Sequence, residues 1–245
     1  MYPPLEIIEL SKAYNNKEAV KNISFKINKN EIVGILGPNG CGKTTTIGMI
    51  LGLLKPSKGK VLINGIEIED KRVELLNSLN FISPYIELPK KLTVKQNLEV
   101  YGRLYDVKNL GIKIEYLTEK LRLNEIIYKI TGELSSGQKN RVSLAKSIIN
   151  DPKVLLLDEP TASLDPETGD FVRSFLENYQ KEKEASILLA SHNMAEVERL
   201  CSSVLMMKNG VIIDRDSPQE LIKKHGRTNL EDVFLKLTRE NYELK

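Results

Sequence analysis

The feature that most constrains the fold of this chain is a glycine-rich octamer between an apolar run and a helical pattern. It consists of Gly37, Pro38, Asn39, Gly40, Cys41, Gly42, Lys43 and Thr44. Glycines permit positive φ, so that backbone N–H groups can converge on phosphate oxygens. The helix that follows would point the positive end of its dipole at the same anion. The strand–loop–helix context that such a loop requires is present, and we predict a site for the phosphates of ATP.

Two side chains of the octamer have chemistry suited to a nucleotide. Lys43 can reach the β- and γ-phosphates, and the Thr44 hydroxyl can bind Mg²⁺. Thr45 follows them and is included among the predicted nucleotide-binding residues. Cys41 has two interpretations, a tolerated small residue or a thiol activated by the helix N-terminus and Lys43.

A pair of acids follows another buried strand, Val154 to Leu157. Adjacent strand residues point in opposite directions, so Asp158 and Glu159 cannot share one role. Asp158 suits Mg²⁺, and Glu159 suits a base that orients the attacking water. Two buried acids would be costly without a cation, which Mg²⁺ would supply.

The bulk composition is that of an ordinary globular chain of 245 residues, with 41% hydrophobic residues and a net charge of +3. This charge is small and scattered, so no nucleic-acid partner is expected. No apolar run approaches the roughly 20 residues of a membrane span. The N-terminus lacks the pattern of a signal peptide, and two cysteines, Cys41 and Cys201, fit a reducing cytosol.

The strand and helix patterns predict an α/β fold. Two Asn-Gly pairs, at 64–65 and 209–210, lie between apolar runs and predict tight hairpins. Alternation in Ile23, Phe25 and Ile27 indicates a half-buried strand, so the first third should be partly antiparallel. Residues 94–130 lack a convincing strand pattern and are expected to be helical. Val154 to Leu157 and Ser186 to Ala190 are expected as buried strands of a parallel sheet.

The segment Leu134-Ser135-Ser136-Gly137-Gln138 is similar to the Leu-Ser-Gly-Gly-Gln signature of the ATP-binding-cassette ATPases. Together with the octamer and the acids, the resemblance covers nearly the whole chain. It implies a nucleotide-binding domain over 1–215, with a phosphate-loop core of mostly parallel sheet and an N-terminal antiparallel β subdomain. A helical subdomain over about 84–150 would carry the signature. Residues 216–245 would form a C-terminal helical tail.

The resemblance also implies roles for further residues. Tyr14 matches the aromatic residue that stacks on adenine, and His192 matches a histidine that contacts the γ-phosphate and the catalytic glutamate. Catalytic residues would thus be Glu159, His192 and Lys43. Asp165 matches a loop that crosses to a partner subunit, and it equally fits a helix N-cap followed by proline.

In the family, two cassettes join head to tail around ATP. Ser135, Ser136 and Gly137, at a helix start, would form a second anion site. Lys43 and Ser135 of opposite chains would then bind the same nucleotide. The implied partner is a second nucleotide-binding domain, either an identical chain or a paralogue.

Two positions depart from the family pattern. Pro84 lies where a glutamine that helps to bind Mg²⁺ and water is expected, and proline offers neither an amide side chain nor an N–H. Gln96 comes too late in the sequence to replace it. Ser136 replaces a glycine and adds a Cβ near the expected γ-phosphate. We expect hydrolysis to persist, with slower turnover as one outcome.

The tail Leu230 to Thr238 resembles that of prokaryotic cassettes that serve export permeases. It is equally explained as an amphipathic helix with a Thr228–Glu231 capping box and an apolar stripe. We predict an ATPase subunit at the inner face of the membrane, bound to a separate permease, most simply an exporter. The alternative is a soluble cassette ATPase without a permease, for example in iron–sulfur cluster assembly. A guanine-specific Asn-Lys-x-Asp motif is missing from the sequence, which disfavours a GTPase.

Overall fold

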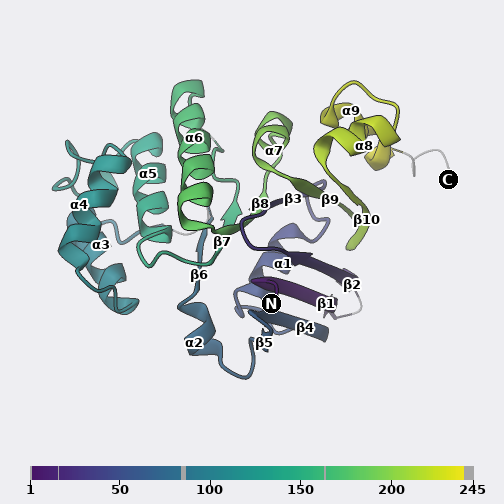
Figure 1. Ribbon diagram of the computed structural model, residues 1–245, viewed down its shortest axis with the longest axis horizontal. Helices are drawn as coiled ribbons and strands as arrows, with labels where there is room; N and C mark the ends of the chain where they lie inside the picture. Colours follow the sequence, from purple (N-terminus) through teal and green to yellow (C-terminus); the bar gives the residue numbers. More distant parts are fainter. Residues whose placement is uncertain (1, 16, 84–86, 163, 240–245) are drawn as a thin grey trace.

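The computed structural model of the protein describes residues 2–15, 17–83, 87–162 and 164–239. Within these residues the chain forms two sheets, a four-stranded sheet in the order β2-β1-β4-β5 and a six-stranded sheet in the order β10-β9-β3-β8-β7-β6 (Figure 1). The strands are β1 (Leu5–Tyr14), β2 (Lys17–Ile27), β3 (Ile32–Leu36), β4 (Lys58–Ile63), β5 (Ile66–Glu67), β6 (Leu79–Ile82), β7 (Val154–Asp158), β8 (Ser186–Ala190), β9 (Ser203–Lys208) and β10 (Val211–Asp216). The helices are α1 (Lys43–Ile50), α2 (Arg72–Leu76), α3 (Val94–Leu104), α4 (Leu110–Lys120), the short 3₁₀ helix η1 (Thr131–Glu133), α5 (Ser136–Ser147), α6 (Pro166–Lys183), α7 (Met194–Leu200), α8 (Pro218–Lys224) and α9 (Leu230–Arg239).

The six-stranded sheet is the centre of the molecule, and its strands are parallel except at β10. It is buried on both faces, since β3 sends Val33 and Ile35 into one hydrophobic core and Ile32 and Leu36 into the other. Helix α1 lies on one side of this sheet, between it and the four-stranded sheet, and α6 and α7 lie on the other (Figure 1). The predicted α/β class with a mostly parallel sheet is confirmed. Because the strands are parallel, the loops after β3, β7 and β8 leave from the same edge.

The N-terminal sheet is antiparallel, as predicted. Ile23, Phe25 and Ile27 of β2 are buried between exposed residues and face the core. The β4–β5 hairpin turns at Asn64 and Gly65, whose φ values of 52° and 81° are those of a type I′ turn. The second predicted hairpin, β9–β10, turns in the same way at Asn209 and Gly210. Both Asn-Gly predictions are confirmed.

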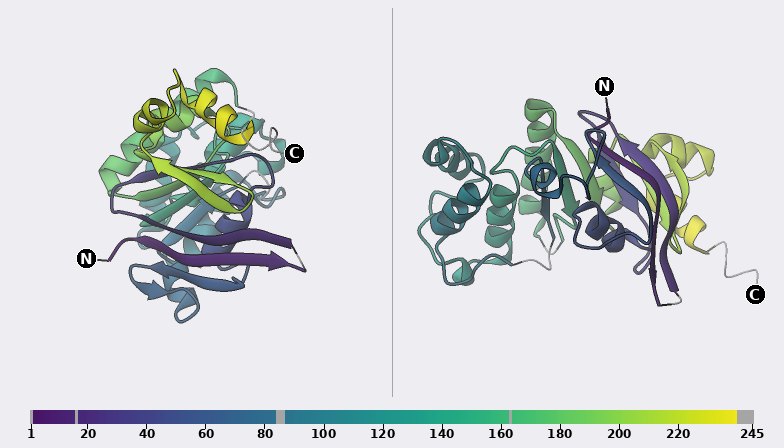
Figure 2. Two further views of the ribbon diagram at one scale, coloured as in Figure 1. Left: turned by 90° about the vertical axis from the view of Figure 1, so that its right-hand side faces the viewer. Right: turned by 90° about the horizontal axis from the view of Figure 1, so that it is seen from below.

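Residues 94–130 contain α3 and α4, followed by a run of turns over 121–130, and an isolated bridge joins Thr93 to Ile130. Helices α3, α4 and α5 form a group at the end of the molecule away from α8 and α9 (Figures 1 and 2). Helix α3 begins with a capping box in which Gln96 Oε1 accepts from the Thr93 N–H at 2.9 Å. Gln96 is thus used in capping a helix, consistent with its exclusion as a substitute for the glutamine of the family pattern.

The C-terminal helices α8 and α9 pack beside α7. Leu230 and Val233 of α9 are buried, as expected for the apolar stripe. The expected Thr228–Glu231 capping box is wrong. Asn229 caps the helix instead, and its amide oxygen accepts the Asp232 N–H at 2.8 Å. Asn229 lies three residues before Asp232, the spacing at which an N-cap side chain reaches a free N–H of the first turn. Among the described helices, none is long and apolar enough to span a membrane.

Candidate functional site

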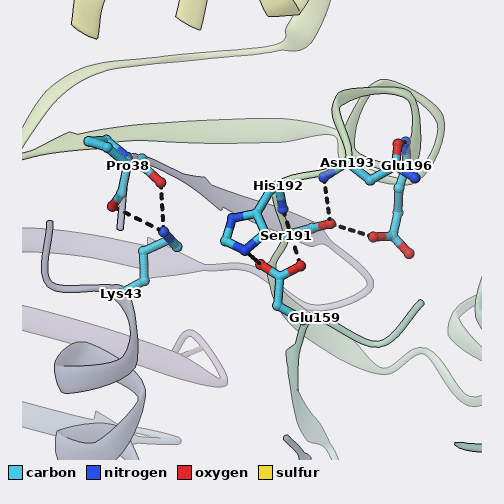
Figure 3. A network of polar contacts seen from close by, with 8 residues as sticks. Pro38, Lys43, Glu159, Ser191, His192, Asn193 and Glu196 are labelled. Atoms are coloured by element: carbon cyan, nitrogen blue, oxygen red, sulfur yellow. Dashed lines mark hydrogen bonds and ion pairs between the residues drawn. The ribbon is translucent and has the colours of Figure 1, made fainter. Parts of the chain in front are cut away.

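The glycine-rich octamer forms a loop between β3 and α1. Gly40 and Gly42 have φ values of 77° and 115°, in the positive range that glycine adopts without strain and that most other residues avoid. Lys43, the first residue of α1, folds back over the loop, and its Nζ donates to the carbonyls of Gly37 at 2.6 Å and Pro38 at 3.3 Å (Figure 3). The lysine side chain is therefore already held across the loop where a phosphate chain would bind.

The β9–β10 hairpin holds this loop from behind. Gly210 donates its N–H to the Cys41 carbonyl at 3.0 Å and accepts the Lys21 N–H at 2.8 Å. Gly37 lies so close to β9 that an added Cβ would come within 2.2 Å of the Met207 carbonyl oxygen. The hairpin thus fixes the shape of the phosphate loop, a role that the sequence pattern alone did not suggest.

Cys41 is buried within the loop. Burial raises the pKa of its thiol, and this outweighs the opposing effect of Lys43. The structure therefore contradicts an activated thiol and supports a small residue that fills space in the loop.

A cavity of about 240 Å³ joins the loops that leave β3, β7 and β8. It is lined by Ala19, Asn39, Gly40, Gly42, Lys43, Thr44, Thr45, Asp158, Glu159 and His192. The structure therefore brings together the loop lysine and threonines, both acids and the histidine, which lie far apart in sequence. Ala19 of β2 lines the cavity as well, although no sequence motif marked it.

Glu159 and His192 are in polar contact in this cavity. The His192 backbone N–H donates to Glu159 Oε2 at 3.3 Å, and the ring Nε2 lies 3.0 Å from Oε1 (Figure 3). Burial, with repulsion from Asp158 in addition, raises the pKa of Glu159 to about 7 despite the hydrogen bond from His192. Burial lowers the pKa of His192, which favours the neutral imidazole. The carboxylate therefore has a proton affinity suited to a general base near neutral pH.

Asp158 ends β7 and is only 5% exposed. Burial raises its pKa, while Lys43, a hydrogen bond from Ser83 and His192 oppose the rise. A buried carboxylate that lines the same cavity as the Thr44 hydroxyl would offer, together with that hydroxyl, the oxygen donors that Mg²⁺ prefers. These residues therefore fit a magnesium ion bound together with a nucleotide. Pro84, the departure from the family pattern beside Ser83, lies outside the described residues.

Glu196 supports the loops around Glu159. It is fully buried, and its carboxylate accepts from Thr161 Oγ1 at 2.9 Å and from Ser191 Oγ at 2.5 Å. These bonds join the loop after β7 to the loop after β8 and the start of α7. Figure 3 shows the contact between Ser191 and Glu196. A single acid in a helix gives no sequence signal for this role, which depends on two loops distant in the chain.

The remaining predicted residues lie outside the cavity. Tyr14, at the end of β1, is 45% exposed, with Lys12 Nζ 5.2 Å from its ring. Ser135 caps α5 through the Gln138 N–H at 3.3 Å, and Ser136 and Gly137 form the first turn. Asp165 caps α6 by accepting the Thr168 N–H at 3.0 Å, which confirms its N-cap interpretation. Within the described residues, the chain thus does not bring Ser135 and Lys43 into one cavity.

Comparison with known proteins agrees with this geometry. Residues 20–162 match the family model of the ABC transporter. The ABC transporter ATP-binding protein NatA of Bacillus subtilis (strain 168) is 33% identical over 238 residues, which cover 94% of this chain and 96% of that protein. The Nod factor export ATP-binding protein I of Rhizobium sp. (strain N33) is 33% identical over 94% of this chain and 76% of its own length.

Solved structures give the same result. An ATP-binding subunit of an ABC transporter has a TM-score of 0.88 at 27% identity, covering 96% of this chain and 99% of that one. The cbiO1 protein of Clostridium perfringens, part of the ABC transporter complex cbiONQ, has a TM-score of 0.81 at 30% identity, covering 100% of this chain and 99% of that one. The chain is therefore an ATP-binding, ATP-hydrolysing member of the ABC transporter family.

Proposed function

We propose that this chain is the ATPase subunit that powers a separate membrane permease, and that it works in export. The observation that carries the proposal is the cavity in which Lys43 and Thr44 face Asp158, Glu159 and His192. Such a cavity contains a phosphate anchor, oxygen ligands for a cation and a base beside one another. These are the parts that phosphoryl transfer to water requires.

Each residue has one part in the proposed reaction. Lys43 and the N–H groups of the phosphate loop hold the β- and γ-phosphates. Thr44 and Asp158 would hold Mg²⁺, which neutralises charge on the phosphates. Glu159 accepts the proton of the attacking water or orients it, and His192 holds the Glu159 carboxylate in place.

In this proposal a second chain completes the nucleotide-binding site. Ser135, Ser136 and Gly137 are near the exposed start of α5, with Ser135 and Ser136 exposed to solvent, and so they are available to the ATP of a partner. A bacterial ABC transporter cassette that was solved as a dimer is 25% identical to this chain with a TM-score of 0.79, which supports the arrangement. Tyr14 is proposed to stack on adenine, and Asp165 to lie near the partner.

The transport role rests on the relatives. One is named for Nod factor export, and another is part of a transporter complex. By analogy the chain would bind a permease with transmembrane helices at the inner face of the membrane. The proposal of export, rather than uptake, follows the Nod factor relatives and the resemblance of the tail.

The catalytic part is tested with Glu159→Gln. We expect the variant to bind ATP with unchanged affinity and to lose about 10²–10⁴-fold in phosphate release, the usual contribution of a general base. Glu182→Gln, on the exposed face of α6, is the matched control and should retain wild-type activity. Wild-type turnover in Glu159→Gln would remove Glu159 from this role.

The transport part is tested by affinity purification of the tagged chain from detergent-solubilised membranes of its own cells. Recovery of a stoichiometric polytopic membrane protein, with ATPase stimulated in its presence, would support the proposal. Recovery of soluble partners alone would contradict it and favour the cluster-assembly alternative.

A further inference from the structure

Helix α5 and the loop that carries Glu159 are joined by one short side-chain contact. Asn140 Nδ2 donates to the Pro160 carbonyl at 2.6 Å. Pro160 directly follows Glu159, so this bond reaches the loop one residue after the proposed catalytic base. Asn140 comes from the same helix that begins at Ser135, the residue proposed to contact the nucleotide of the partner.

The loop that receives this bond has an unusual backbone. Glu159 has a φ of 52°, in the left-handed region that residues other than glycine seldom adopt. Such a conformation is retained only when surrounding contacts hold it. On one side the Glu159 N–H donates to the Ala190 carbonyl of β8 at 2.8 Å. On the other side the bond from Asn140 holds the Pro160–Thr161 peptide, one peptide beyond the one that follows Glu159.

The face of α5 that carries Asn140 packs along the chain after Glu159. Gly137 lies three residues earlier, on the same helix face. A Cβ added at Gly137 would be 3.5 Å from Thr168 Cγ2, so the first turn of α5 lies against the first turn of α6. The N-terminal half of α5 therefore lies against both Pro160 and Thr168.

The chemistry of the contact requires an N–H donor. The Pro160 carbonyl is an acceptor, so a carboxylate or an apolar side chain at position 140 could not replace the amide. Asn140 Oδ1 is buried and has no hydrogen-bond partner in the described part of the chain. It lines a cavity of about 250 Å³ that Glu159 and Ser136 also line.

We propose that Asn140 is a positioning residue that links α5 to Glu159. Through Pro160 it sets the backbone of Glu159, so that a nucleotide bound at the start of α5 favours the productive position of the carboxylate. This inference rests on the proposed role of Glu159 and on the proposed second anion site at Ser135. The Asn140 contact would connect two sites within one chain. One is the start of α5, which would complete the nucleotide site of the partner, and the other is Glu159, the base of the chain's own site.

The test compares three substitutions at this position. Asn140→Asp has nearly the same shape and volume without a donor, Asn140→Leu has the same branching but is bulkier and has no donor, and Asn140→Gln retains the amide. We expect the first two to lower kcat at least about tenfold, because a misplacement near 1 Å can cost as much as about 10²-fold. KM for ATP and the melting temperature should change little, and Asn140→Gln should recover much of kcat. Ser143 lines the same cavity, and Ser143→Ala is the matched control.

Other results would overturn the inference. Wild-type kcat in Asn140→Leu and Asn140→Asp would show that the bond does not position Glu159. A fall in kcat that follows a fall in melting temperature, or an equal loss in Asn140→Gln, would indicate a structural role only. The proposed function is judged separately, by the activity of Glu159→Gln and by its mass in the presence of ATP. Those two measurements do not depend on Asn140.

Discussion

The backbone N–H of His192 donates to Glu159 Oε2 at 3.3 Å, and its ring Nε2 lies 3.0 Å from Oε1 without making a hydrogen bond there. The backbone contact survives any substitution of the side chain, whereas the ring contact does not. His192 thus combines a contact fixed by the fold with one that depends on the imidazole. The two contributions can be separated by mutation.

We expect His192→Ala to lower kcat by at least about tenfold, but by less than Glu159→Gln, because the backbone N–H still orients the carboxylate. Steady-state phosphate release at saturating ATP measures this. The other histidine of the chain supplies the control. His225 binds Asp214 at 2.7 Å, between α8 and β10, and His225→Ala should leave kcat unchanged. Full activity in His192→Ala would show that the ring contact has no part in hydrolysis.

Lys146 gives a prediction about pH. This lysine of α5 is buried, with Nζ 4.7 Å from the centre of the Phe81 ring and 3.3 Å from the Phe81 carbonyl oxygen. Burial lowers its pKa to about 8 from an ordinary value of 10.5. A base with a lowered pKa in the fold binds its proton more tightly when the chain is unfolded. The wild-type protein should therefore gain stability as the pH rises from about 8 to about 10.

Lys146→Met removes this titration. The free energy of unfolding of the wild type, minus that of Lys146→Met, should increase between pH 7.5 and pH 9.5, as measured by urea unfolding. Lys120→Met is the control, because Lys120 is exposed on α4. A difference between wild type and Lys146→Met that stays constant over this range would contradict the burial of a charged group.

Two glycines of the phosphate loop should tolerate substitution differently. A Cβ at Gly37 would meet the Met207 carbonyl oxygen at 2.2 Å and Cys41 Sγ at 2.4 Å, whereas nothing lies within 4 Å of one at Gly40. We expect Gly37→Ala to cost about 1–3 kcal/mol of stability, as overpacking does. Gly40→Asn should cost little, because asparagine tolerates positive φ. Chemical denaturation of both variants measures the difference, and equal stabilities would contradict the packing of the loop against β9.

Local patterns in the sequence predicted much of this fold. The Asn-Gly hairpins, the buried strands and the cap at Asp165 each depend on residues near one another in the chain. The approach of Lys43, Asp158 and His192 was predictable because parallel strands present their carboxyl ends at one edge. Asn140 and Glu196 were not predictable, since each contacts a loop distant in sequence. The cap of α9 was misplaced by one residue because Thr228 and Asn229 are both good N-cap residues.

In the proposed mechanism, two chains enclose ATP between Lys43 of one and Ser135 of the other. Light scattering of Glu159→Gln tests it directly, since this variant should retain the bound ATP. With Mg²⁺ and ATP its mass should double from the 27.7 kDa of one chain. The double variant Glu159→Gln with Ser135→Arg should bind ATP and yet remain at the mass of one chain. A Glu159→Gln protein that stays monomeric with ATP bound, or a double variant that dimerises equally well, would contradict the claim.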